Sequence, residues 1–280
     1  MTAHLLDGKA ASLAWQAELG ERIKSLPSPP CLALVRVGED PASGIYVRKK
    51  TEMCGRLGIR SELIHLPEKT TQKELLSRIE SLNADKTVNG ILVQVPLPKQ
   101  IDALAIQQAI HPLKDADGFG PESMGLLLMG RPRFIAATPA GIMRLLSHYH
   151  LSPAGKHAVV VGRSNIVGKP IAQLLLAKDA TVTIAHSQTP NLAAITRQAD
   201  LLVVAVGKAG LITKEMVKPG AIVIDVGMNK DKAGKSCGDV DFPGVSSVAA
   251  YATPVPGGVG PMTVAMLMQN AVAAAGRKIG

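Results

Sequence analysis

Apolar runs and helix-like stretches alternate along the chain in two series. Short runs rich in β-branched and apolar residues form the first series at 31–37, 61–66 and 89–95, with amphipathic stretches between them at 44–57 and 71–82. A second series has its apolar runs at 157–161, 180–185, 201–206 and 221–226. Runs of this length, separated by helix-length segments, are typical of β-α-β units. The pattern therefore predicts an α/β protein with largely parallel sheets.

A stretch rich in Gly, Pro and Asp, residues 114–139, separates the two series and predicts a domain junction. Helical periodicity precedes the first series at 9–25 and follows the junction at 140–150. The apolar, small-residue segment 262–275 predicts a buried helix at the end of the chain. Periodicity alone does not assign this last helix to either domain.

Composition fits this picture and excludes several classes of protein. At about 150 residues per domain, 280 residues make about two domains, and 46% apolar with 19% charged residues is globular rather than disordered. No apolar run approaches the roughly 18 residues of a membrane span, and the N-terminal residues do not resemble a signal peptide. Three widely separated cysteines predict neither a disulfide framework nor a cysteine zinc site, so we expect a reduced, cytoplasmic protein.

The formal net charge of +9 favours an anionic partner. Basic residues are scattered among acidic ones, and Phe, Trp and Tyr together number only seven, which gives few rings for stacking bases. We therefore expect a solvated basic surface with a local anion site, and no nucleic acid or membrane partner.

The segment 158–170 reads as a strand, a glycine turn and the start of a helix, with Gly162 and Gly168 in the turn. Such a turn can bind a phosphate, because glycine lets the backbone approach and the helix N-terminus faces the anion. The spacing is not the standard G-x-G-x-x-G, so a glycine turn without a ligand remains the alternative.

The residues at the end of the next predicted strand indicate which dinucleotide the turn would bind. It ends in His186, Ser187, Gln188 and Thr189, with no carboxylate to hold the ribose 2′-hydroxyl of NAD. Arg163 in the glycine turn supplies a cation suited to a 2′-phosphate. The sequence favours NADP over NAD, with His186 as a solvated strand-end residue.

Three further segments are candidates for ligand contact. Tyr46 and Lys50 are one helical turn apart and share a face, as an acid/base site would need, although a basic surface turn has the same pattern. Gln94 stands at a strand end before two prolines, and the loop 253–263 holds three glycines and three prolines. Asp115 and Asp117 lack a nearby third ligand and so predict no metal site; one of them could hold an amidine-like heterocycle.

In combination these motifs resemble the bifunctional methylenetetrahydrofolate dehydrogenase/methenyltetrahydrofolate cyclohydrolase family over nearly the whole chain. The motifs occur in the family's order: Tyr46-Val-x-x-Lys50, Val-Gln94-x-Pro-Leu-Pro, Lys-Asp-x-Asp117-Gly-Phe, Gly162-Arg-Ser-x-Ile-Val-Gly168, Asp225-Val-Gly-Met-Asn229, Gly238-Asp-Val-Asp241 and Pro254-Val-Pro-Gly-Gly-Val-Gly-Pro-Met-Thr263. From the 280 residues we expect no appended formyltetrahydrofolate synthetase domain.

The resemblance implies oxidation of 5,10-methylenetetrahydrofolate by NADP and hydrolysis of the methenyl product to 10-formyltetrahydrofolate, within one-carbon metabolism that serves purine, methionine and histidine synthesis. By similarity Lys50 is the general acid/base, Gln94 orients it, Tyr46 packs over the folate, Ser43 supports them and Asp117 grips the pterin ring. The remaining folate contacts implied are Val95, Pro96, Leu97, Pro256, Gly257 and Gly258.

For the cofactor, the resemblance implies a second, Rossmann-like domain whose contacts are Thr138, Gly162, Arg163, Ser164, Ile166, Gly168, Ser187 and Gly227. It implies a folate-binding domain of residues 1–139 plus the C-terminal helix 262–280, an NADP-binding domain of residues 140–261, and the folate cleft between them. It also implies a homodimer, and substrates that include anionic polyglutamylated folates.

The chain departs from the family pattern around these residues. Gly120 and Ser123 stand where the family usually has His and Asn, Ala136 and Ala137 replace Pro and Cys, Ala185 replaces a Cys, and Gln188 a common basic residue. Two other functions stay open at this point. One is a dehydrogenase with weak or lost cyclohydrolase activity, or a Rossmann oxidoreductase for another small substrate; the other is a non-catalytic binding protein.

Overall fold

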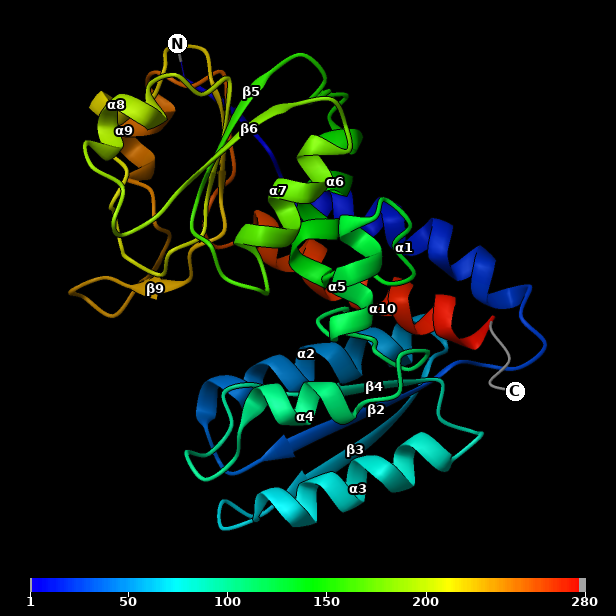
Figure 1. Cartoon of the computed structure of the whole chain (residues 1–280). Helices are drawn as coiled ribbons and strands as arrows, with labels where there is room; N and C mark the ends of the chain where they lie inside the picture. The colour runs from blue at the N-terminus through cyan, green and yellow to red at the C-terminus, as the bar shows by residue number, and fades with distance from the viewer. Residues whose placement is uncertain (1, 277–280) are drawn as a thin grey trace. The chain divides into compact units, whose positions relative to one another are not determined.

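The computed structural model describes residues 2–276, without the side chains of residues 41 and 42. The chain forms two compact units (Figure 1). The six-stranded unit combines the chain up to Leu13 with Thr138–Thr263, and the three-stranded unit combines Ala14–Ala137 with the chain from Val264 onward. Both are α/β, as the alternating pattern predicts.

The three-stranded unit is built on a parallel sheet of order β3-β2-β4. Its elements are α1 (Gly8–Lys24, which begins in the other unit), β2 (Cys31–Val37), α2 (Pro41–Leu57), β3 (Arg60–Leu66), α3 (Gln72–Ala84), β4 (Gly90–Val93), α4 (Ala103–Ala109) and α5 (Pro121–Leu128). Local signals fix several boundaries. Asp40 accepts a hydrogen bond from the Ser43 amide at the start of α2, and Thr71 and Glu74 form a capping box on α3.

Helices cover both faces of this sheet. On one face, α3 and α4 pack on alternate strand residues in a buried core that includes Val35, Ile79, Ile91 and Ile106. On the other face, the Cys54 thiol of α2 contacts the Met268 sulfur of α10 (Val259–Ala275) at 3.4 Å. Because both faces are covered, β2 is a nearly continuous buried apolar run rather than an alternating one.

The six-stranded unit has a parallel sheet of order β1-β11-β8-β7-β5-β6. Its strands are β1 (His4–Leu5), β5 (His157–Val161), β6 (Thr181–Ala185), β7 (Leu201–Val204), β8 (Ile222–Asp225) and β11 (Tyr251–Ala252). Its helices are α6 (Ala137–His148), α7 (Gly168–Leu176), α8 (Leu192–Thr196), the 3₁₀ turn η1 (Lys214–Met216) and α9 (Phe242–Ser246). A separate two-stranded ribbon pairs β9 (Asn229–Lys230) with β10 (Ser236–Cys237).

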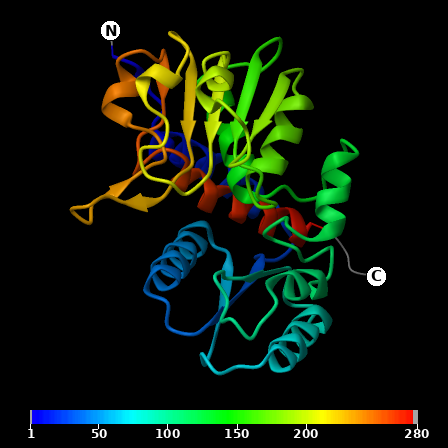
Figure 2. The ribbon, with the colours of Figure 1, turned by 60° about the vertical axis from the view of Figure 1, so that its left-hand side comes forward.

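The strand order reverses at β5. The chain moves outward from β5 to β6 and then returns to the other side of β5 with β7. Helices α6 and α7 lie on one side of the sheet, and α8 and α9 on the other (Figures 1 and 2). Open sheets of this kind bind ligands at the carboxyl ends of the strands that flank the reversal. The glycine turn after β5 therefore lies at the expected ligand position.

Two expectations about organisation need correction. The sequence-based boundaries place residues 1–139 in one domain and start the returning helix at residue 262, but the chain up to Leu13 falls in the six-stranded unit and α10 crosses between units after Thr263. The reason is long-range pairing: His4 and Leu5 pair with Tyr251 and Ala252, which no local pattern can reveal. The stretch 114–139 is not only loop, because it contains α5.

Candidate functional site

A lysine–glutamine pair stands at the carboxyl end of β4 in the three-stranded unit. Lys50 extends from α2, and its Nζ donates a hydrogen bond of 2.9 Å to Oε1 of Gln94, the residue that follows β4. The Gln94 amide is held in turn, because its Nε2 donates to the Val95 carbonyl at 2.6 Å. Burial lowers the pKa of the Lys50 ammonium below its ordinary value, and the negative charge of Asp117 opposes this shift. The lysine is thus oriented and easier to deprotonate than a surface lysine.

Asp117 is the acidic partner of this pair. Burial raises the pKa of its carboxyl to about 7, and the charge of Lys50 lowers it while that of Asp115 adds to the rise. The mutual effect of Lys50 and Asp117 places the two groups in one electrostatic environment. The structure therefore brings together three of the predicted site residues: Lys50, Gln94 and Asp117.

The other residues predicted for this unit flank the same elements. Tyr46 lies one turn before Lys50 on α2 and is half-buried, which raises the pKa of its phenol. Ser43 is buried in the first turn of α2. Val95 and Pro96 are exposed after the strand end, whereas Leu97 packs against the apolar core of the unit. The exposed pair is free to meet a ligand, and Leu97 has mainly a packing role.

The glycine turn between β5 and α7 has no room for a side chain at Gly162 or at Gly168. A Cβ on Gly162, whose φ is +127°, would lie 2.3 Å from the Ala205 carbonyl oxygen, and one on Gly168 would lie 2.2 Å from the Gly162 carbonyl oxygen. The Gly162 amide also donates to the carbonyl of Ala185 at the end of β6. The backbone is thus drawn tightly against two strand ends, as close approach to a dinucleotide phosphate requires.

Side chains around this turn fit a phosphorylated ribose better than a free 2′-hydroxyl. Arg163 and Ser187 are exposed in the loops after β5 and β6, which are neighbouring strands, and no carboxylate ends β6. The Ser164 hydroxyl is engaged locally, since it accepts hydrogen bonds from the amides of Val167 and Gly168 at the start of α7. Ile166 is 41% exposed at the turn. These residues fit NADP.

Two buried aspartates that the sequence reasoning left without a role organise the neighbouring loops. Asp225, at the end of β8, accepts hydrogen bonds from the amides of Gly227, Asp239 and Val240. The Asp239 carboxylate accepts from three amides after β7 and from the Asn229 side chain. A Cβ on Gly227 would lie 2.4 Å from the Asp239 carboxyl carbon. The sequence signals these roles only weakly: Asp225 stands two residues before Gly227 at the end of β8, and Asp239 directly follows Gly238.

The remaining predicted contacts lie near the start of α10 and α6. The Thr138 and Thr263 hydroxyls are 3.0 Å apart. Gly257 has a φ of +109°, and its carbonyl accepts a hydrogen bond from the Gly8 amide, while Pro256 is exposed and Gly258 buried. The Gly257 carbonyl thus fixes the N-terminal segment against this loop within the six-stranded unit.

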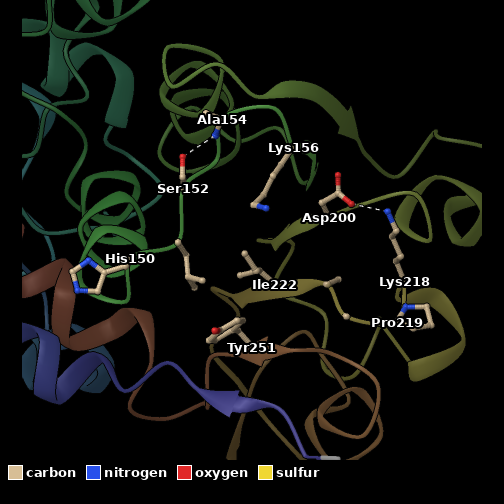
Figure 3. Close-up of a pocket in the computed structure, with 12 residues that line it drawn as sticks. His150, Ser152, Ala154, Lys156, Asp200, Lys218, Pro219, Ile222 and Tyr251 are labelled. Atoms are coloured by element: carbon tan, nitrogen blue, oxygen red, sulfur yellow. Dashed lines mark hydrogen bonds and ion pairs between the residues drawn. The ribbon is translucent and has the colours of Figure 1, made fainter.

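The six-stranded unit also has a cavity of about 380 Å³ at the amino ends of β5, β8 and β11 (Figure 3). Lys156, Asp200, Lys218 and Tyr251 are among its lining residues, and Lys218 pairs with Asp200 at 2.6 Å. Asp200 also accepts a hydrogen bond from the His157 amide and so fixes the start of β5. The cavity lies at the opposite end of the strands from the glycine turn.

Membrane-spanning helices and metal sites are both absent from the residues that the structure describes. Within the described part of the chain, no helix is both long and apolar enough to cross a membrane. Among the same residues, no group of three His, Cys, Asp or Glu side chains is arranged to hold a metal ion.

Comparison with protein families matches both parts of the chain. Residues 6–117 match the model of the tetrahydrofolate dehydrogenase/cyclohydrolase catalytic domain, and residues 136–279 match that of its NAD(P)-binding domain. Two similar proteins, both named bifunctional protein FolD, come from Methylibium petroleiphilum and Geobacillus thermodenitrificans. Each is 53% identical, over 100% of both chains in the first case and 98% of both chains in the second.

Solved structures agree with these matches. A bifunctional FolD methylenetetrahydrofolate dehydrogenase/cyclohydrolase from Campylobacter jejuni has a TM-score of 0.96 and 48% identity, covering 98% of this chain and 99% of that one. The Trypanosoma brucei enzyme, solved with NADP and an inhibitor, has a TM-score of 0.93 and 38% identity, covering 99% and 98%. With both domain models matched and relatives this similar over the full length, the chain belongs to the tetrahydrofolate dehydrogenase/cyclohydrolase family.

Proposed function

We propose that this protein catalyses the NADP-dependent oxidation of 5,10-methylenetetrahydrofolate to 5,10-methenyltetrahydrofolate, and the hydrolysis of that product to 10-formyltetrahydrofolate. The observation that carries the proposal is the Lys50–Gln94 hydrogen bond of 2.9 Å beside Asp117, in a chain that matches both domains of the family. This arrangement has the base, its orienting group and an acidic anchor that the two reactions on one folate need.

In hydrolysis Lys50 acts as the general acid and base. With its pKa lowered by burial, a neutral Nζ removes a proton from the water that attacks the methenyl carbon. Nζ then returns that proton to N5 of the folate as the bond between N5 and the one-carbon unit breaks. The hydroxyl proton of the intermediate leaves to solvent, and the formyl group stays on N10. Gln94 Oε1 holds Nζ in place for both transfers.

Asp117 anchors the pterin ring. A carboxylate can accept two parallel hydrogen bonds from the amidine-like edge of a pterin, which fixes the ring in one orientation. With its pKa raised to about 7 by burial, Asp117 carries a charge that is only partly favoured before a ligand arrives, so hydrogen bonds from the pterin stabilise its ionised form. The half-buried Tyr46 offers an aromatic face one helical turn from Lys50.

The six-stranded unit would hold the nucleotide. Gly162 and Gly168 would let the backbone approach its phosphates, and Arg163 and Ser187 would face its 2′-phosphate. When bound, NADP would supply the hydride acceptor for oxidation of the folate. The protein's part in that step is to align the two rings, and no acidic or basic side chain is required for it.

Further properties follow from the same proposal. The protein acts in the cytoplasm as a homodimer, on folates that include polyglutamylated forms, in support of purine, methionine and histidine synthesis. The net charge of +9 supports anionic substrates, and β6 supports dimer formation because it is an edge strand with Ile184 40% exposed. Light scattering of the purified protein measures the oligomeric state.

The test of the proposed function is a pair of absorbance assays with methylenetetrahydrofolate. Reduced nicotinamide and methenyltetrahydrofolate are followed together, with NADP and NAD in parallel. We expect NADP reduction with little accumulation of the methenyl compound. If the methenyl compound accumulates and then disappears only at the rate of its spontaneous opening, hydrolysis is lost. No reduction with either cofactor would contradict the proposal.

A further inference from the structure

A second aspartate closes the turn that carries Asp117. Asp115 is 4% exposed, and its Oδ1 accepts hydrogen bonds from the amides of Gly118 at 3.0 Å and Phe119 at 3.4 Å. Its Oδ2 accepts from the Gly120 amide at 2.8 Å and from the Ser123 hydroxyl at 2.6 Å. Both oxygens are therefore occupied by the chain itself, and Asp115 has no lone pair directed at a ligand of Asp117.

The chain on the other side of Asp117 is fixed to the sheet. The Ile91 amide donates to the Lys114 carbonyl at 2.7 Å, and the Ala116 amide donates to the Ile91 carbonyl at 3.3 Å. Asn270, a buried residue of α10, donates from Nδ2 to the Ala116 carbonyl at 2.9 Å. Asp117 thus stands between a segment anchored by backbone pairing and a turn anchored by the carboxylate of Asp115.

The turn is closely packed at Gly118 and Gly120, where no side chain would fit. A Cβ on Gly118, whose φ is +71°, would lie 2.6 Å from the Ile135 carbonyl carbon. One on Gly120 would lie 2.9 Å from Asp115 Oδ2. The Gly120 amide and the Ser123 hydroxyl both donate to Oδ2 of Asp115. Positions 120 and 123 therefore meet at one carboxylate oxygen.

We propose that Asp115, with the Ser123 hydroxyl, is a positioning residue that fixes the direction of the Asp117 carboxylate toward the folate. This inference rests on the proposed function for the identity of the ligand. Loss of the carboxylate leaves the buried amides of Gly118 and Gly120, and the partly buried amide of Phe119, without their acceptor, and the turn must move to satisfy them. Displacement of a substrate anchor by about 1 Å costs roughly 100-fold in rate.

Three variants in the full-length protein test the proposal. Asp115→Asn replaces one acceptor oxygen with a donor, Ser123→Ala removes one hydrogen bond, and Ser123→Thr keeps the hydroxyl. Ser77→Ala, at an exposed serine of α3, is the matched control. We measure KM and kcat for methylenetetrahydrofolate, the Kd for NADP, and the exchange rates of the Gly118 and Gly120 amides.

For Asp115→Asn we expect kcat/KM for the folate to fall about 100-fold, with a raised KM and an unchanged NADP Kd. For Ser123→Ala we expect a loss of about three- to tenfold, with Ser123→Thr and Ser77→Ala near wild type. Exchange of both glycine amides accelerates in Asp115→Asn. If Asp115→Asn fails to fold, the folate KM and kcat of Ser123→Ala and Ser123→Thr show whether the Ser123 hydroxyl is needed to position Asp117.

Two results would overturn the inference. One is a folded Ser123→Ala or Asp115→Asn protein with wild-type folate KM and kcat. The other is a loss of kcat in proportion to the folded fraction with KM unchanged, which is the mark of a purely structural residue. If wild-type protein shows neither activity, the proposed function fails; unchanged amide exchange in Asp115→Asn would then still refute the positioning role.

Discussion

The two units prepare their ligand sites in different ways. In the three-stranded unit the chemistry lies in side chains: Lys50 and Gln94 are joined by a hydrogen bond, and Asp117 shares their electrostatic environment. In the six-stranded unit it lies in the backbone, where Gly162 and Gly168 have no room for a Cβ. If the proposed function holds, we expect changes of charge in the first unit to alter proton transfer and folate binding. Added bulk at the two glycines of the second unit should instead alter nucleotide affinity.

The largest effect is expected for Asp117→Ala. Removal of a buried carboxylate that anchors the substrate leaves the pterin hydrogen-bond donors unpaired. We expect kcat/KM for the folate to fall about 10²- to 10³-fold in both activities, as measured by steady-state kinetics. Glu52→Ala, at an exposed acidic residue of α2, is the control. Wild-type kinetics in Asp117→Ala would remove Asp117 from the site.

Gln94→Glu should change the pH dependence of hydrolysis. A carboxylate in place of the amide, 2.9 Å from Lys50 Nζ in the native pair, favours the ammonium and raises the pKa of Lys50. Because hydrolysis needs the neutral amine, the rising limb of its pH profile should move to higher pH, with at least about a tenfold loss of rate near neutral pH. Gln108→Glu, on the exposed side of α4, should leave the profile in place. An unmoved profile in Gln94→Glu would separate Gln94 from Lys50 function.

Gly168→Ala tests the backbone side of the comparison. Its Cβ would lie 2.2 Å from the Gly162 carbonyl oxygen, so the turn must open. We expect the Kd for NADP, measured by calorimetry, to rise at least about tenfold, or 1.4 kcal/mol, with hydrolysis of methenyltetrahydrofolate close to wild type. Gly20→Ala is the control, because nothing lies within 4 Å of its Cβ position. Tight NADP binding by Gly168→Ala would contradict this assignment of the turn.

The smallest effect is expected for Arg163→Ala. An exposed guanidinium contributes a screened interaction to a 2′-phosphate, so NADP affinity should fall about tenfold or less while NAD affinity stays constant. Raising the salt concentration should shrink the difference between variant and wild type. Lys178→Ala, a basic residue beyond the far end of α7, controls for net charge. An equal loss for both dinucleotides would remove Arg163 from the 2′-phosphate site.

The sequence predicts much of each unit because its signals are local. The apolar runs 31–37 and 157–161 are confirmed as β2 and β5 with the same ends. It does not predict β1, because two residues carry no periodicity and their partners Tyr251 and Ala252 are nearly 250 positions away, His4 pairing with Tyr251. Nor does it predict helix α5, because the surrounding stretch is rich in glycine and proline, which are typical of loops.

Part of the candidate site can be predicted from the sequence, again because the signals are local. Tyr46 and Lys50 are linked by helical spacing, and the structure has a hydrogen bond from Lys50 Nζ to Gln94 Oε1. Asp115 and Asp117 look equivalent in the sequence, yet the former faces backbone amides and the latter shares the environment of Lys50. Only the course of the backbone distinguishes two carboxylates two residues apart.

The most direct test of the division between the units is Lys50→Met, with hydrolysis of methenyltetrahydrofolate and the Kd for NADP measured on the same preparation. Loss of general acid/base catalysis should slow hydrolysis by about 10²- to 10⁴-fold, while the NADP Kd stays at the wild-type value. Lys49→Met, at the exposed neighbouring lysine, should change neither. Hydrolysis that survives in folded Lys50→Met, or that falls only together with NADP affinity, would contradict the account.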